Sequence, residues 1–211
     1  MKTVLRLLLV VFAAALLGAA PAQAVTVDFT STTWSGVSGL NTFTDPDSGI
    51  TISSTGGNMT FNSSLAERAG CVLAGPTGLA CRGDGIGIND DEVTGNLTEV
   101  LKLTFSTPVN LFDVHVLDLF RHEGGANEWV GLSTDGITYT FFESPGGNLG
   151  GYFATGFSAK NVSTLFMKGR NDPVSDVSLA RIAYEPVPEP ATLLLLGAGL
   201  AGLGLRRRRR P

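Results

Sequence analysis

Apolar and polar residues alternate in short segments over most of the chain, and this period of two predicts β-strands rather than helices. In the segment 98–106, the apolar residues Leu101, Leu103 and Phe105 occupy every second position, so we expect one face of this strand to be buried. Turn-forming residues separate ten segments of this kind: 25–30, 49–54, 57–62, 98–106, 109–118, 128–133, 137–143, 151–157, 161–168 and 177–184.

Residues between these segments indicate how neighbouring strands connect. Asp135-Gly136 lies between two of them, and this pair favours a tight hairpin turn because it accepts positive φ. Thr107-Pro108 separates two further segments and predicts another tight connection. Outside the two ends, no segment shows a sustained helical period. The expected fold class is all-β, an antiparallel β-sandwich of jelly-roll-like type, in one domain at 25–185.

The segment 109–118 has a second clear alternation. Phe112, Val114 and Val116 share its apolar face. Because His115 alternates with them, we expect His115 to be exposed on the other face.

The first 24 residues have the organisation of a secretory signal peptide. Positive charges precede an apolar run, and small residues at Ala22 and Ala24 form an Ala-x-Ala cleavage site. We therefore expect an N-terminal signal peptide helix at 1–24, with cleavage between Ala24 and Val25. The alternative is an uncleaved membrane anchor.

The C-terminal segment 186–211 combines three features in order. Pro188, Glu189 and Pro190 come first, followed by 15 residues without a charge and then by five arginines. As a helix, 15 residues span about 22 Å, which is short for a hydrocarbon core of about 30 Å. The arginines stay on the cytoplasmic side, so the preceding domain would be exported. We expect a C-terminal transmembrane helix that is later removed, and a permanent single-span anchor is the alternative.

This order of motif, apolar segment and basic end resembles the PEP-CTERM sorting signal of Gram-negative bacteria. The resemblance implies that an exosortase-type membrane protease recognises Pro188-Glu189-Pro190 and removes the tail. The protein would pass transiently through the inner membrane and reach the cell surface or the extracellular space, in bacteria that make extracellular polysaccharide. The segment is sometimes given an ice-binding protein C-terminal label, which describes the tail and is no evidence of ice binding.

The charge of the expected domain narrows the classes of partner. The segment 25–185 contains 8 Lys and Arg against 18 Asp and Glu, a net charge of −10, whereas the whole chain carries −4. Nucleic-acid binding depends on basic residues that neutralise phosphates, so this balance argues against a nucleic-acid partner.

Cys71 and Cys81 are the only cysteines of the chain. In an exported protein such a pair indicates a disulfide, and a metal-binding pair without a nearby His is a poor alternative. In the chain-entropy model the disulfide would stabilise the folded state by about 3 kcal/mol.

An acidic, glycine-rich segment directly follows Cys81. Oxygen-bearing side chains on a flexible loop suit Ca²⁺, which takes six to eight oxygen ligands. The candidate metal ligands are Asp84, Asn89, Asp90, Asp91 and Glu92. Their spacing is not the EF-hand pattern, so a solvated acidic turn between two strands stays open as the alternative.

Aromatic side chains are the candidates for sugar binding, because their faces can stack on sugar rings. Trp34 and Trp129 lead this group, and Tyr139, Tyr152 and Phe120 are further candidates. Each of them could equally be a core residue.

The chain has few residues suited to catalysis. His115 and His122 are its only histidines, and neither lies near a Gly-x-Ser-x-Gly nucleophile motif. We therefore predict no enzyme activity and a role as an exported surface or extracellular-matrix protein associated with extracellular polysaccharide. The alternatives are a calcium-dependent carbohydrate-binding module and a polysaccharide-modifying hydrolase, since pairs of carboxylates are brought together only by the tertiary structure.

Overall fold

The computed structural model describes residues 23–62, 85–90, 92–95, 97–121, 126–146, 151–172, 174–187 and 199. Ala24–Pro186 forms one compact unit. The signal peptide helix and the transmembrane helix expected at the two ends lie outside the described residues. Among the described residues, no helix has the length and apolar character needed to cross a membrane.

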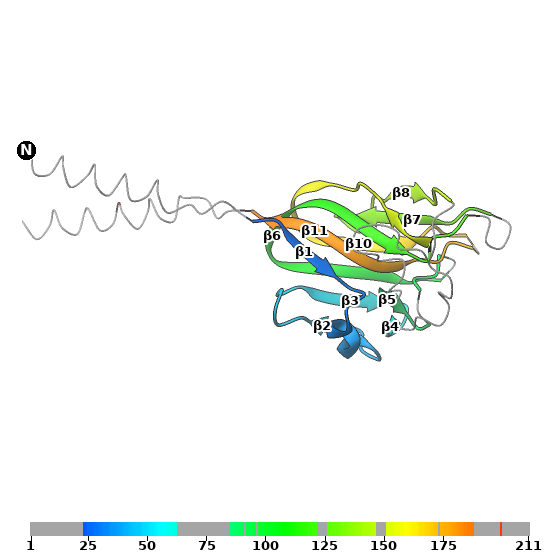
Figure 1. Cartoon of the computed structure of the whole chain (residues 1–211), viewed down its shortest axis with the longest axis horizontal. Helices are drawn as coiled ribbons and strands as arrows, with labels where there is room; N and C mark the ends of the chain where they lie inside the picture. Colours follow the sequence, from blue (N-terminus) through cyan, green and yellow to red (C-terminus); the bar gives the residue numbers. More distant parts are fainter. Residues whose placement is uncertain are drawn as a thin grey trace, which may run out of the picture. The chain divides into compact units, whose positions relative to one another are not determined.

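Nearly all regular elements of the described chain are β-strands, as the alternating pattern predicts (Figure 1). The elements are β1 (Val25–Asp28), the 3-10 helix η1 (Thr32–Val37), β2 (Thr42–Thr44), β3 (Thr51–Thr55), β4 (Met59–Asn62), β5 (Gly85–Ile88), β6 (Val100–Leu117), β7 (Trp129–Ser133), β8 (Thr140–Glu143), β9 (Phe153–Ala154), β10 (Ala159–Gly169) and β11 (Ser178–Pro186).

All described strands are hydrogen-bonded into one large antiparallel sheet. This confirms the part of the prediction that gave an all-β fold with antiparallel strands. The main path through the sheet is β4-β5-β11-β6-β10-β7-β8, with β1 on β11, β2 on β3, and β3 and β9 on β6. β3 and β11 follow one another along one edge of β6, and β10 runs along its other edge. β6 is therefore the central strand of the fold.

β6 continues through Thr107-Pro108, so the tight connection predicted there is wrong. The pairing with β10 advances by two residues from Val162 to Thr164, while β6 moves five residues from Val109 to Thr104. These additional residues of β6 have no partners on β10, and a proline can occupy such a position because it has no N–H to donate. A proline after a strand segment thus marks an irregularity here, not a reversal of the chain.

A bulge on β6 changes the alternation expected in the segment 109–118. Asp113 pairs with Ala183 and Leu111 pairs with Tyr184, which leaves Phe112 as one extra residue on β6. Because a bulge shifts the side-chain alternation, Leu111 is buried while Phe112 is 44% exposed. Phe112 therefore lies outside the buried set in which the sequence pattern placed it.

The hairpin predicted at Asp135-Gly136 is confirmed, although its loop is longer than two residues. β7 pairs with β8, and the loop runs over 134–139. Gly136 has a φ of 73°. Asp135 Oδ1 accepts hydrogen bonds from the backbone N–H groups of Ile137 and Thr138, each at 2.8 Å. These bonds stabilise the ionised carboxylate and lower the pKa of Asp135 to about 2.

One hydrophobic core joins side chains from the whole sheet. Ile52 on β3, Leu103 on β6, Met167 on β10 and Ile182 on β11 all belong to it and are fully buried. Leu101, Leu103 and Phe105 share the buried face, as the alternation in 98–106 predicts.

Candidate functional site

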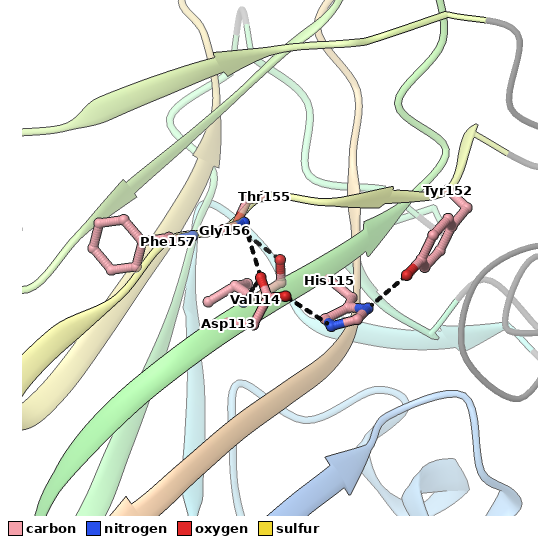
Figure 2. Close-up of polar contacts among 7 residues, drawn as sticks. All are labelled: Asp113, Val114, His115, Tyr152, Thr155, Gly156 and Phe157. Atoms are coloured by element: carbon pink, nitrogen blue, oxygen red, sulfur yellow. Dashed lines mark hydrogen bonds and ion pairs between the residues drawn. The ribbon is translucent and has the colours of Figure 1, made fainter.

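Asp113 and His115 on the central strand and Tyr152 beside it form a polar cluster in which His115 and Tyr152 are buried and Asp113 is partly buried (Figure 2). Asp113 and His115 lie two positions apart on β6, so their side chains leave the strand on the same face. Tyr152 directly precedes β9, which pairs with β6 beside His115. The Nδ1 atom of His115 lies 2.9 Å from the Tyr152 hydroxyl, and its Nε2 atom lies 3.3 Å from Asp113 Oδ2.

Asp113 also accepts hydrogen bonds from the backbone of β6 and from the backbone of the segment that follows β9. Its Oδ1 atom accepts hydrogen bonds from the N–H groups of Val114 at 2.8 Å and Gly156 at 2.9 Å. The Thr155 hydroxyl donates to the carbonyl of Val114 at 2.8 Å. These bonds attach the segment around β9 to β6, as Figure 2 shows.

The surroundings of His115 favour its neutral form. His115 is 6% exposed, and Arg181 lies directly opposite it on β11. Burial lowers the pKa of His115 from its usual value, the positive charge of Arg181 lowers it further, and Asp113 opposes the shift without reversing it. A neutral imidazole protonated at Nε2 satisfies both contacts, since Nε2–H donates to Asp113 and Nδ1 accepts the Tyr152 hydroxyl.

The expectation that His115 is exposed is wrong. His115 does point away from the face of Val114 and Val116, but the segment containing Tyr152 and β9 covers it. Alternation along one strand shows which residues share a face and does not show whether another segment covers that face.

The cluster is suited to holding β6 and the β9 segment together. Both ring nitrogens of His115 face protein groups, and Tyr152 is only 9% exposed. Hydrogen-bonded polar groups in a buried position define one packing arrangement of the segments that carry them.

The cluster predicts a loss of stability in mild acid. Because the folded state lowers the pKa of His115, the unfolded chain binds a proton more readily below pH about 6.5. The free energy of unfolding should therefore fall as the pH drops from about 6.5 toward the folded-state pKa, by at most about 1.4 kcal/mol per pH unit for one proton. Urea unfolding at a series of pH values measures this slope.

The chain offers a matched control for this measurement, because it has two histidines. His115→Gln should remove the part of the pH dependence of the unfolding free energy that His115 causes, whereas His122→Gln should leave that part unchanged. Identical slopes for the wild-type protein and His115→Gln would show that His115 does not titrate as expected.

The residues predicted to bind Ca²⁺ are described only in part. Asp84 and Asp91 lie outside the described residues. Asn89 directly follows β5 and has a φ of 64°, and its side-chain amide donates to Glu99 Oε1 at 2.6 Å. Asp90 Oδ1 accepts the backbone N–H of Glu92 at 3.2 Å. Asn89 thus directs its nitrogen, and not its oxygen, toward the neighbouring carboxylate.

Glu99 is a buried acid that sequence reasoning missed. It is 2% exposed, and its Oε2 atom accepts the backbone N–H of Thr94 at 2.8 Å. Burial raises the pKa of Glu99, and the nearby negative charges of Asp90 and Asp176 raise it further. The hydrogen bonds from Thr94 and Asn89 oppose this shift. Nothing in the sequence around Glu99 separates it from an exposed acid, because its burial depends on partners elsewhere in the chain.

Calcium binding stays a prediction. Within the described ranges, no group of three or more His, Cys, Asp or Glu side chains is arranged to hold a metal ion.

The two leading candidates for sugar stacking have different surroundings. Trp34 is 3% exposed and packs against Phe29 and Phe43, with ring centroids 4.7 and 6.0 Å away. It is therefore a core residue, with no free ring face for a sugar. Trp129 is only partly buried, and the guanidinium of Arg170 lies 4.5 Å from its ring centroid.

Three other predictions fall wholly or partly outside the described residues. The predicted signal cleavage point between Ala24 and Val25 coincides with the start of β1. The cysteines of the predicted disulfide and the sorting motif lie outside the described part: Cys71, Cys81, Pro188, Glu189 and Pro190. The disulfide and the cleavage point stay predictions.

Comparison with known proteins gives a match at the C-terminus. Residues 186–209 match the model of the PEP-CTERM protein-sorting motif. No curated protein and no solved structure matches the chain. The resemblance based on Pro188, Glu189 and Pro190 is thereby confirmed. The chain carries a PEP-CTERM protein-sorting motif at its C-terminus, which implies an exported, cell-surface-sorted protein that exosortase processes.

Proposed function

We propose that this protein is a non-enzymatic component of the cell surface or extracellular matrix that associates with extracellular polysaccharide. The match of residues 186–209 to the PEP-CTERM motif is the observation that carries this proposal, because the motif implies export and processing. The Asp113-His115-Tyr152 cluster supports a non-enzymatic role, since its polar atoms bind one another.

Processing at both ends would leave the sheet complete. β1 begins at Val25, directly after the proposed signal cleavage point, and β11 ends at Pro186, two residues before Pro188 of the sorting signal. Val25 pairs with Tyr184, so the first and last strands support each other within the domain. Neither cleavage would remove a described strand. The proposed disulfide between Cys71 and Cys81 would suit the oxidising environment of an exported domain.

The sheet is also proposed to curve into a jelly-roll-like sandwich. The unpaired residues of β6 between Thr104 and Val109 favour a bend, and strands on both sides of them contribute to one core. β3 and β11 would then face each other without being hydrogen-bonded neighbours. NMR contacts between their methyl groups would support this arrangement, and their absence in the folded protein would contradict it.

The matrix role is tested by comparing two strains, one that makes extracellular polysaccharide and one that does not. We expect the processed protein to sediment with the polysaccharide in the first strain and to appear in the medium of the second. A blot of each fraction measures the shift. The same distribution in both strains would contradict an association with polysaccharide, and export alone would then remain.

A further inference from the structure

Three basic residues lie over three aromatic rings on one face of the sheet. Lys102 Nζ lies 5.7 Å from the ring centroid of Phe166, and Lys168 Nζ lies 4.3 Å from that of Tyr139. The Arg170 guanidinium lies 4.5 Å from the ring centroid of Trp129. We call these six residues the cation–aromatic face.

Strand geometry places these residues together. Phe166 and Lys168 on β10, and Arg170 directly after it, alternate with the buried residues Leu165, Met167 and Gly169, so they share the outer face. Lys102 lies on the neighbouring strand β6, directly opposite Phe166 in the strand pairing, so it is on the same face. Trp129, the first residue of β7, lies beside Arg170. The backbone carbonyl of Trp129 accepts a hydrogen bond from the backbone N–H of Arg170 at 3.0 Å. Tyr139 ends the loop that leads to β8.

The lysines of this face keep their hydrogen-bonding capacity for a ligand. Within the described part of the chain, neither Lys102 nor Lys168 forms an ion pair. An aromatic ring attracts an ammonium group through its electrons and accepts few of its N–H donors, so both partly exposed lysines retain donors for a ligand. Arg170 differs, since its Nε donates to Asp172 at 2.7 Å.

The surrounding surface offers apolar and hydroxyl contacts. Phe141 is 37% exposed, and its ring lies so close above Gly131 that an added Cβ would approach it to 2.7 Å. Thr104 and Thr164 lie two positions from Lys102 and Phe166 on their strands, and they pair with each other. Threonines on the neighbouring strands extend this pair into a row across the same face: Thr44, Thr51, Thr104 and Thr164. A sugar polymer needs both kinds of contact, for its C–H faces and for its hydroxyl groups.

Charge determines which polymer suits this face. The segment 25–185 has only 8 basic residues against 18 acidic ones, and three of the 8 lie on the cation–aromatic face. Two acids adjoin the face directly: Glu143 on β8 pairs with Trp129, and Asp135 in the loop before β8 lies close enough to Tyr139 for its charge to act on it. The remaining acidic surface repels an anionic polymer, so such a polymer has favourable contacts mainly here.

We propose that the cation–aromatic face binds an acidic polysaccharide. The ammonium groups of Lys102 and Lys168 pair with the carboxylates of the polymer, and the exposed ring of Phe141 contacts a sugar face. This inference rests on the proposed association with extracellular polysaccharide and assigns it a site and a ligand class.

The test measures binding of the exported protein, purified from culture, to two polymers. Alginate is a polymer of uronic acids, and dextran is a neutral glucan. We expect calorimetry at low ionic strength to show alginate binding that weakens as salt is added, with dextran binding much more weakly. Lys102→Gln combined with Lys168→Gln should weaken alginate binding by about tenfold or more, because each change removes a charge-assisted hydrogen bond.

Two control variants separate a local effect from a general one. Lys160→Gln removes one lysine charge at an exposed position of β10, eight residues before Lys168, and should alter binding by less than about twofold, whereas Lys102→Gln or Lys168→Gln alone should weaken it more. Lys102→Arg combined with Lys168→Arg keeps both charges and should retain most of the affinity. A thermal unfolding curve for each variant shows whether it is folded.

Each other result overturns a specific statement. Alginate binding that the double glutamine variant leaves unchanged removes the cation–aromatic face as the site, while the association with polysaccharide survives. Equal binding of dextran removes the acidic ligand class. Binding to phosphatidylglycerol vesicles without binding to alginate points to a membrane as the occupant and overturns the proposal. If the protein also fails to bind the polysaccharide of its own matrix, the proposed function itself fails.

Discussion

Replacing Pro188, Glu189 and Pro190 with three alanines is expected to keep the protein at full length in the inner membrane. These residues lie within the segment 186–209 that matches the sorting motif, and the motif implies processing by exosortase, which we propose recognises these three residues. The folded domain ends at Pro186, so the change leaves every described strand intact. Blots of membrane, surface and medium fractions measure the result, and we expect a near-complete shift to the unprocessed form.

Two comparisons show whether this shift reflects lost recognition. Pro211→Ala changes a proline outside the matched residues and should leave processing unchanged. The wild-type chain in a strain without exosortase should accumulate in the same way as the alanine variant. Normal processing of the alanine variant would contradict the role assigned to the three residues.

Asp113→Ala is expected to give the second large effect, a decrease of about 2–3 kcal/mol in the free energy of unfolding at pH 7. The carboxylate of Asp113 accepts the N–H groups of Val114 and Gly156 and faces Nε2 of His115. Removing it leaves these donors without their acceptor in a partly buried position. Urea unfolding of the exported protein measures the loss.

Asp47→Ala is the matched control for this prediction. Asp47 is exposed and lies in a turn, so its removal should change the free energy of unfolding by less than about 0.5 kcal/mol. An equally small change for Asp113→Ala would show that the cluster on β6 contributes little to stability.

The alternation of side chains predicted one part of the fold well, because that part follows a simple rule. In 98–106 one face of the strand meets the core, and the other carries Lys102 in a partly exposed position. A strand with one buried and one solvated face has a period of two, which the sequence displays directly.

The same rule failed where the pairing of distant strands decides the outcome. The exposure of Phe112 depends on a bulge opposite β11, and the burial of His115 depends on the segment around Tyr152. Thr107-Pro108 resembles a turn in the sequence, yet β3, β10 and β11 hold β6 extended on both sides of it. These partners are remote in sequence, so no local pattern contains them.

The sequence by itself determined that the protein is exported and sorted, because a processing enzyme reads a contiguous motif whose residues are joined by covalent bonds. Only the tertiary structure decided which polar residues are buried and which basic and aromatic residues lie on one face. Glu99 and Asp113 differ from exposed acids only through their partners, and Lys102 meets Phe166 only because β6 pairs with β10. Such contacts depend on long-range strand pairing, which is the cooperative result of packing the whole core.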